Sequence, residues 1–270
     1  MLVATLGIFS LVVSFCPALA QNKVTVRIDG GTLLAGVVDD LARDFNKANP
    51  TCACTVTGSS TGIGFKKMIE GKAEVAMMTR KVTSEEAKVA EAKGVTLSYK
   101  PIGKIGLAVV TNSKNTVSEL TMDQLARIFK GEITNWSQVG GPNEHIRVTT
   151  RAVPETGSGV LFKEIVLKGA PYAKDAQIMS SFRTTLLVCG KSFAIGYMPT
   201  TTIHFDRLAE HGIKIIRIKK DANSEPYQLA QGVASESLYP ISVDFYLYWN
   251  SKQDGTCTNG FAEFCAKQSQ

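Results

Sequence analysis

Hydrophobic positions along the chain form short runs that alternate with stretches of helical spacing. Runs typical of buried strands occupy residues 24–28, 54–57, 73–78, 106–111 and 146–150. After most of these runs, apolar residues recur every three or four positions, first over residues 33–45, which predicts amphipathic helices. Strands that alternate with helices in this way favour an α/β fold with mainly parallel sheets.

Polar residues mark where two of these helices begin. Thr83 with Glu86, and Thr121 with Gln124, each have the spacing of a capping box. In this motif the two side chains bond to each other's backbone N–H groups at the first turn, so we expect helices to start at both places.

The first twenty residues are set aside as a leader. Residues 2–13 are apolar but too few to cross a bilayer, and Ala18 and Ala20 give the small-x-small pattern of a cleavage site. We expect a secretory signal over residues 1–20, cut after Ala20, and therefore an exported, periplasmic protein.

Charge and composition narrow the possible partners. The 270 residues are 44% hydrophobic and 20% charged, which excludes a disordered chain or a coiled coil. The net charge is +6, but the basic residues are scattered, so we expect a soluble anion as partner and no nucleic acid. Nucleotide, dinucleotide and zinc-peptidase motifs are missing from the sequence, and we expect neither a cofactor nor a metal.

An odd number of cysteines follows the leader: Cys52, Cys54, Cys189, Cys257 and Cys265. In an exported protein some of them can be oxidised. Cys257 and Cys265 flank a short segment near the end of the chain and are the expected disulfide. Cys52 and Cys54 lie two apart in a strand, so both should point to the same face, and strain opposes a bridge between them.

One strand–turn–helix motif occurs three times, around Thr32, Ser59 and Ser158. In each case a strand runs into a turn of Gly with Ser or Thr, and a helix follows. The first N–H groups of a helix have no partner within it, and its dipole is positive at this end, so each turn is a candidate anion site. Ser and Thr also cap many helices without binding anything.

A second function class fits part of the same sequence. Gly58, Ser60 and Gly62 match the G-x-S-x-G elbow of serine hydrolases, between a strand and a helix as that motif requires. Asp206 and His211 are the available partners for a triad, but they lie close together and no oxyanion segment precedes Ser60. A serine hydrolase with Ser60 as nucleophile therefore stays an alternative.

Beyond these features, several segments in order resemble one family, the phosphate-binding components of ABC importers. The segments are residues 56–64, 74–80, 120–136, 139–142, 157–159, 194–197 and 239–242. The resemblance implies a two-lobed type II periplasmic-binding fold, with an oxyanion held between lobes that are joined by two crossovers. It places lobe 1 at residues 21–104 plus 226–270 and lobe 2 at 105–225, with crossovers near residues 100–106 and within 221–239.

The same resemblance assigns ligand contacts residue by residue. Thr32 would donate through its side chain and backbone, and Leu33 through its N–H. Ser59 matches the donor of a Gly-Ser-Ser turn, and Ser158 and Gly159 match the donors of the second lobe.

This chain departs from the family pattern at three positions. Thr79, followed by Arg80, stands where many members have an Asp that accepts a proton from the ligand; both are candidate ligand residues here, although an exposed Arg that precedes a helix is usually solvated. Val160 replaces a Thr donor. Arg151 stands further from Ser158 than the usual basic residue, so it either reaches the anion or pairs with Glu155.

The sequence thus predicts a monomeric, extracytoplasmic protein that is not an enzyme. It would capture phosphate or a similar tetrahedral oxyanion for a membrane permease. A sensory protein that binds the same anion without an importer would have the same sequence features.

Overall fold

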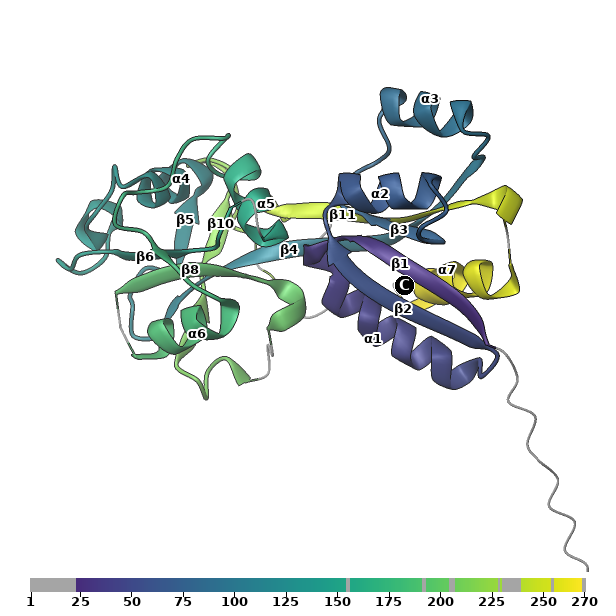
Figure 1. The fold of residues 1–270 in the computed structure, drawn as a ribbon. Helices are drawn as coiled ribbons and strands as arrows, with labels where there is room; N and C mark the ends of the chain where they lie inside the picture. The colour runs from purple at the N-terminus through teal and green to yellow at the C-terminus, as the bar shows by residue number, and fades with distance from the viewer. Residues whose placement is uncertain are drawn as a thin grey trace, which may run out of the picture.

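A computed structural model describes residues 23–153, 156–190, 193–203, 207–227, 229, 239–253 and 255–268. The expected signal segment, residues 1–20, lies outside this set. The chain forms two lobes side by side, with the long strands β4 and β11 running between them (Figure 1). The two-lobed α/β fold expected from the sequence is confirmed.

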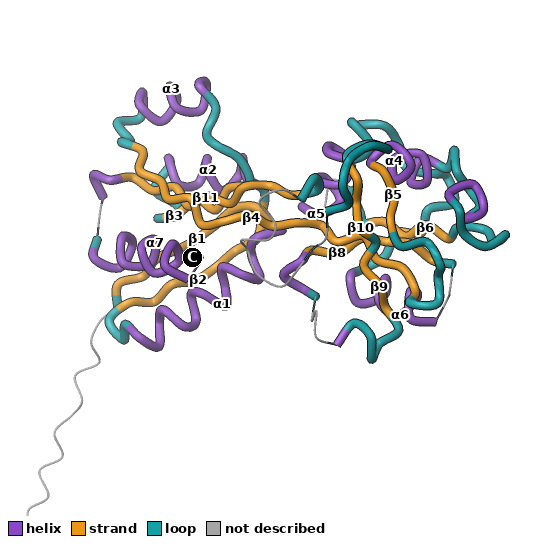
Figure 2. The backbone as a smooth tube through the Cα atoms, turned by 180° about the vertical axis from the view of Figure 1, so that it is seen from behind, coloured by secondary structure: helices purple, strands orange, loops and turns teal. Residues whose placement is uncertain are grey.

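The first lobe is built around three parallel strands in the order β2-β1-β3. Its N-terminal elements are β1 (Val24–Gly31), α1 (Thr32–Ala48), β2 (Cys52–Ser59), α2 (Thr61–Ile69), β3 (Val75–Met78) and α3 (Ser84–Ala92). Its C-terminal elements are β11 (Ser242–Asn250), a short 3-10 turn (Ser251–Gln253) and α7 (Thr256–Gln268). Strand β11 extends this sheet, because it pairs antiparallel with β3 on one side and with β4 on the other. In both views α3 projects from this lobe (Figure 1 and Figure 2).

The second lobe contains the middle of the chain. Its elements are β5 (Glu119–Thr121), α4 (Met122–Lys130), a 3-10 turn (Trp136–Val139), β6 (Arg147–Thr150), α5 (Gly157–Ile165), β7 (Gln177–Ile178), α6 (Ser181–Gly190), β8 (Ala194–Pro199), a second 3-10 turn (Thr200–Thr202), β9 (Ile213–Ile215) and β10 (Arg217–Lys219). Strands β7, β6 and β8 pair in parallel, and β5 and β10 form a separate parallel pair. Strand β9 pairs antiparallel with β4, and Figure 2 shows it near α6, from behind.

Strand β4 (Leu97–Asn112) belongs to both lobes. Up to Gly106 it pairs antiparallel with β11, and from Leu107 it pairs antiparallel with β8. This change of partner falls at the end of the expected first crossover, residues 100–106. The second expected crossover includes residues 228 and 230–238, which lie outside the described residues, so the lobe boundaries stay a prediction.

Both expected capping boxes are confirmed. The Thr83 hydroxyl accepts from the Glu86 N–H while the Glu86 carboxylate accepts from the Thr83 N–H, and Thr121 and Gln124 do the same at the start of α4. Helix α4 ends at Gly131, whose φ of 80° is in the left-handed region that glycine tolerates best.

The expected disulfide between Cys257 and Cys265 is wrong. Cys257 is bonded to Cys52, with a Cα–Cα distance of 5.7 Å, so the bridge ties β2 to α7. Cys257 and Cys265 lie in the same helix, eight positions apart, which at the rise of an α-helix separates them by roughly 12 Å, beyond disulfide reach. Cys52 and Cys54 are both buried, as expected for residues on one face of a strand.

Candidate functional site

A cavity of about 330 Å³ lies where the start of α5 meets the first lobe. Helices α1 and α2 contribute their N-terminal ends, β3 its C-terminal end, and α5 its first two turns. The lining residues are Gly31, Thr32, Leu33, Ser59, Ser60, Thr61, Gly62, Thr79, Arg80, Gly157, Val160, Leu161, Glu164 and Val243.

Parallel pairing brings the first-lobe part of this cavity together. Gly30 pairs with Gly58 and with Met77, so the loops that follow β1, β2 and β3 emerge at one edge of the sheet. Glycine is required at this edge: a Cβ on Gly30 would lie 2.0 Å from the Met77 carbonyl oxygen, and one on Gly64 would lie 2.5 Å from the Gly30 Cα. The missing side chain at Gly30 leaves room for Met77 of β3, and the missing one at Gly64 lets α2 pack closely against β1.

Three helices present their N-termini to the cavity without a compensating carboxylate in the first turn. Among the described residues, the first turns of α1, α2 and α5 contain no acidic residue, whereas α3 and α4 carry Glu85, Glu86 and Asp123 there. Gly31, the N-cap of α1, makes no side-chain capping bond. The positive dipole ends at the cavity are therefore left for a ligand to neutralise.

Thr32 joins the two lobes. Its Oγ1 accepts a hydrogen bond from the Gly157 N–H at 2.8 Å, and a Cβ on Gly157 would lie 2.9 Å from the Leu33 nitrogen. The starts of α1 and α5 are thus in direct contact. Because the Thr32 hydroxyl acts as acceptor in this bond, its own proton stays available to another partner.

Ser59 has a buried partner that no sequence motif indicated. Its hydroxyl donates to one carboxylate oxygen of Asp29. The other carboxylate oxygen forms an ion pair with the Lys67 ammonium, at 2.5 Å from its Nζ. Asp29 is only 4% exposed. The available signal was an acidic residue near the end of β1, directly before Gly30 and Gly31.

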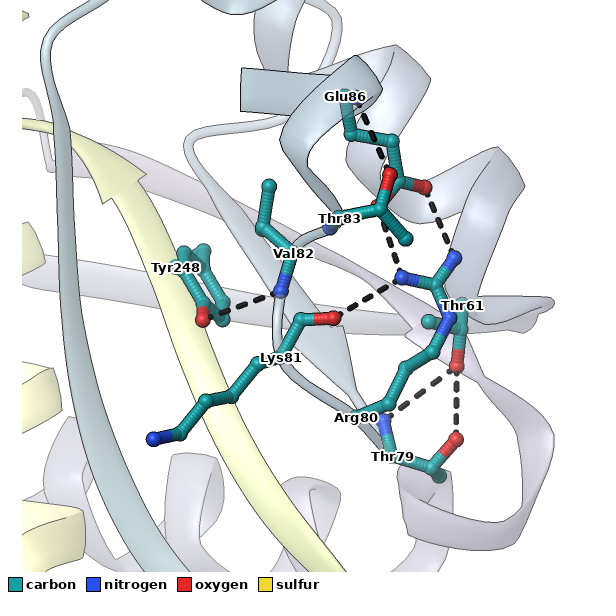
Figure 3. Close-up of polar contacts among 8 residues, drawn as sticks. All are labelled: Thr61, Thr79, Arg80, Lys81, Val82, Thr83, Glu86 and Tyr248. Carbon is teal, nitrogen blue, oxygen red and sulfur yellow. Dashed lines mark hydrogen bonds and ion pairs between the residues drawn. The ribbon is translucent and has the colours of Figure 1, made fainter.

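Thr79 and Arg80 both line the cavity, but their polar groups have partners within the first lobe (Figure 3). The hydroxyl oxygens of Thr79 and Thr61 lie 3.0 Å apart. The Arg80 guanidinium bonds to both carboxylate oxygens of Glu86, at 2.7 and 2.8 Å, and to the Lys81 carbonyl. The hydrogen bond with Glu86 raises the pKa of Arg80 and lowers that of Glu86.

Arg151 is buried and is not among the lining residues. One terminal nitrogen donates to the Met179 carbonyl at 3.0 Å, while its Nε has no partner. Burial lowers the pKa of this guanidinium. Glu155, the alternative partner expected from the sequence, lies outside the described residues, and among the described ones no carboxylate forms an ion pair with Arg151.

Ser158 and Gly159 occupy the first turn of α5 but do not line the cavity. The Gly159 N–H donates to the hydroxyl of Thr156, the N-cap, at 3.2 Å, and Ser158 is 7% exposed. Gly157 and Val160 of the same turn face the cavity instead. Contact of any of these residues with a ligand stays a prediction.

Ser60, the nucleophile of the hydrolase alternative, acts as a cap. Its hydroxyl oxygen accepts from the Ile63 N–H at 3.2 Å at the start of α2. No histidine lines the described cavity, and Asp206 falls outside the described residues. Within the described ranges there is also no group of three potential metal ligands, and no helix there has the length and apolar character needed to cross a membrane.

Comparison with known proteins gives consistent matches. A family model described as a PBP superfamily domain matches residues 17–269. The protein SphX of Synechococcus elongatus is 33% identical over 156 residues, which span 55% of this chain but only 45% of SphX. The phosphate-binding protein PstS of Borreliella burgdorferi is 28% identical over 252 residues, covering 90% of this chain and 85% of that protein.

Among solved structures, an ABC-type phosphate transport receptor from Vibrio cholerae is similar over most of its length. It has a TM-score of 0.69 and 28% identity, with 89% of this chain and 93% of that chain covered. The likeness therefore extends over both lobes.

Proposed function

The chain belongs to the PBP superfamily, and from this premise we propose that it is an extracytoplasmic binding protein that captures inorganic phosphate for the permease of an ABC importer. The names of its relatives, a phosphate-binding protein and a phosphate transport receptor, support this ligand and this partner. The function needs no chemical step on the ligand.

The single observation that carries the proposal is the set of helix N-termini at the cavity. Helices α1, α2 and α5 direct their first turns to it, and no described acidic residue in those turns offsets their dipoles. An oxyanion that leaves water loses a large hydration energy, so it binds in such a cavity only if most of its oxygens receive hydrogen bonds. Unpaired backbone N–H groups and the Thr32 hydroxyl are donors of this kind.

Binding also depends on both lobes. The hydrogen bond between Gly157 and Thr32 joins the second lobe to the first at the cavity. A ligand that receives bonds from both helices would favour this joined arrangement over a separated one, which gives a permease a ligand-dependent surface to recognise. The net charge of +6 would assist the encounter with an anion.

Calorimetric titration of the anion-free protein with phosphate, arsenate, sulfate and molybdate tests the ligand. We expect one phosphate per chain, with arsenate next in affinity. If none of the four anions binds, the proposal is wrong. Phosphate uptake by cells that lack the protein tests the partner, since binding without any loss of uptake would instead indicate the sensory alternative.

A further inference from the structure

A buried carboxylate lies directly behind one wall of the cavity. Asp29 is 4% exposed, receives the Ser59 hydroxyl on one oxygen, and forms an ion pair with the Lys67 ammonium at 2.5 Å through the other. An ionised carboxylate can only accept hydrogen bonds. Ser59 must therefore be the donor in this pair, and its single proton is committed to Asp29.

The commitment of that proton changes what Ser59 can offer a ligand. A serine hydroxyl has one proton and two lone pairs. With the proton held by Asp29, the Ser59 oxygen can serve the cavity only as an acceptor. The family resemblance implies that Ser59 donates to the ligand, whereas this hydrogen bond directs the Ser59 proton to Asp29.

Other hydroxyls at the cavity keep a proton to donate. Thr32 accepts from the Gly157 N–H, which leaves its own proton free. Thr61 and Thr79 share one hydrogen bond between two hydroxyls, so one of their two protons is left over. The cavity thus combines several donors with one hydroxyl that is fixed as an acceptor.

We propose that Asp29 determines selectivity for a protonated tetrahedral oxyanion, because it holds Ser59 in the acceptor state. This inference rests on the proposed function. At neutral pH inorganic phosphate and arsenate each carry at least one hydroxyl proton, so either anion can donate a hydrogen bond to the Ser59 oxygen. Sulfate carries no proton and cannot donate one. Against sulfate the same oxygen faces another acceptor, and a buried polar pair without a proton between its members is unfavourable.

Asp29→Asn tests this mechanism because Lys67 fixes how the new amide must lie. The ammonium of Lys67 attracts the amide oxygen, so the amide NH₂ turns toward Ser59 and donates to it. The Ser59 proton is then released toward the cavity. Loss of the Asp29 charge should raise the affinity for both anions alike; relative to that common change, we expect phosphate affinity to fall about tenfold and sulfate affinity to rise about tenfold, since one hydrogen bond to a charged ligand is lost in one case and gained in the other.

Two further variants separate the role of Asp29 from that of Glu164, an exposed carboxylate in the lining and the competing acceptor. Ser59→Ala removes the acceptor held by Asp29 without creating a donor, so phosphate affinity should fall while sulfate affinity stays low. Glu164→Gln removes a negative charge and should raise the affinity for both anions alike, with the ratio between them unchanged.

The measurement is the ratio of phosphate to sulfate dissociation constants by calorimetry, with thermal unfolding as the check on folding. An unchanged ratio in a folded Asp29→Asn protein overturns the inference, as does a ratio that collapses only in Glu164→Gln. If Asp29→Asn does not fold, an unchanged ratio in Ser59→Ala overturns it equally. Wild-type protein that binds none of these anions would refute the proposed function itself, so the two failures are distinguishable.

Discussion

The Glu86 side chain has two structural roles. Its carboxylate caps α3 by accepting from the Thr83 N–H, and it also holds the Arg80 guanidinium. The capping role follows from the Thr-x-x-Glu spacing and was predicted. The ion pair with Arg80 was not predicted. Arg80 precedes the helix, so the direction of its side chain depends on its rotamer and not on helical spacing. The same contact explains why a cation beside the cavity is already neutralised within its own lobe.

The ion pair should make part of the stability dependent on pH. Because Arg80 lowers the pKa of Glu86 in the folded state, the stabilisation is complete above the unfolded pKa of about 4.3 and is lost as pH falls through the folded value. Both side chains are partly exposed, so we expect about 0.2–1 kcal/mol. Glu86→Gln keeps a capping side chain and removes the charge, and should therefore be less stable than wild type at pH 7, with a smaller difference near pH 3.

Urea unfolding at both pH values measures this difference. Glu85→Gln is the matched control, because Glu85 lies in the same helical turn and has no ion pair among the described contacts. A deficit of Glu86→Gln that is the same at pH 7 and pH 3 would exclude the ion pair as its source.

Among the elements, β2 and α7 illustrate what sequence spacing cannot decide. Cysteine positions predict that disulfides are available, but the partner of Cys257 depends on α7 packing against the first lobe, where Cys52 begins β2. The prediction failed because residues 256–260 form the start of a helix and not a loop. Helix α5 was expected to follow a turn around Ser158; its N-cap is Thr156, and Gly157 rather than Ser158 lines the cavity, so ligand contact by Ser158 stays a prediction.

Loss of the bridge should reduce stability without affecting the cavity. The disulfide closes a sequence separation of 205 residues, and removing a native disulfide typically costs about 2–5 kcal/mol. Cys52 and Ser59 are the two ends of β2, roughly 23 Å apart at the rise of a strand. The double variant Cys52→Ala with Cys257→Ala should therefore unfold at a lower temperature and bind phosphate with unchanged affinity.

A reductant provides the matched comparison for this prediction. It should lower the unfolding temperature of wild type toward that of the double variant and leave the double variant where it is. Peptide mapping should find a fragment that joins Cys52 to Cys257. A linked fragment with Cys257 and Cys265 instead, or a wild-type protein insensitive to reductant, would contradict the pairing.

At the scale of the whole molecule, two kinds of contact connect the lobes within the described residues. Strands β4 and β11 run between them, and the starts of α1 and α5 meet at the cavity (Figure 1). Hydrophobic periodicity predicted the elements and their alternation. The periodicity of a helix or strand, however, does not indicate which lobe the element belongs to. The two-lobed arrangement came from the family resemblance, and the contact between Thr32 and Gly157 came only from the structure, since it joins residues 125 positions apart.

That contact gives the last prediction. Gly157→Ala places a methyl group 2.9 Å from both the Leu33 nitrogen and the Thr32 hydroxyl oxygen, so α5 has to move away from α1. Crowding of this kind costs about 1–3 kcal/mol, and the cost applies only where the lobes are joined, so phosphate affinity should fall about tenfold or more. Gly36→Ala in α1 is the control, because its added methyl group meets nothing within 4 Å and affinity should not change. Small-angle scattering with saturating phosphate should find Gly157→Ala more extended than wild type. Equal affinity and equal dimensions for the two variants would mean that α1 and α5 do not approach each other when the anion is bound.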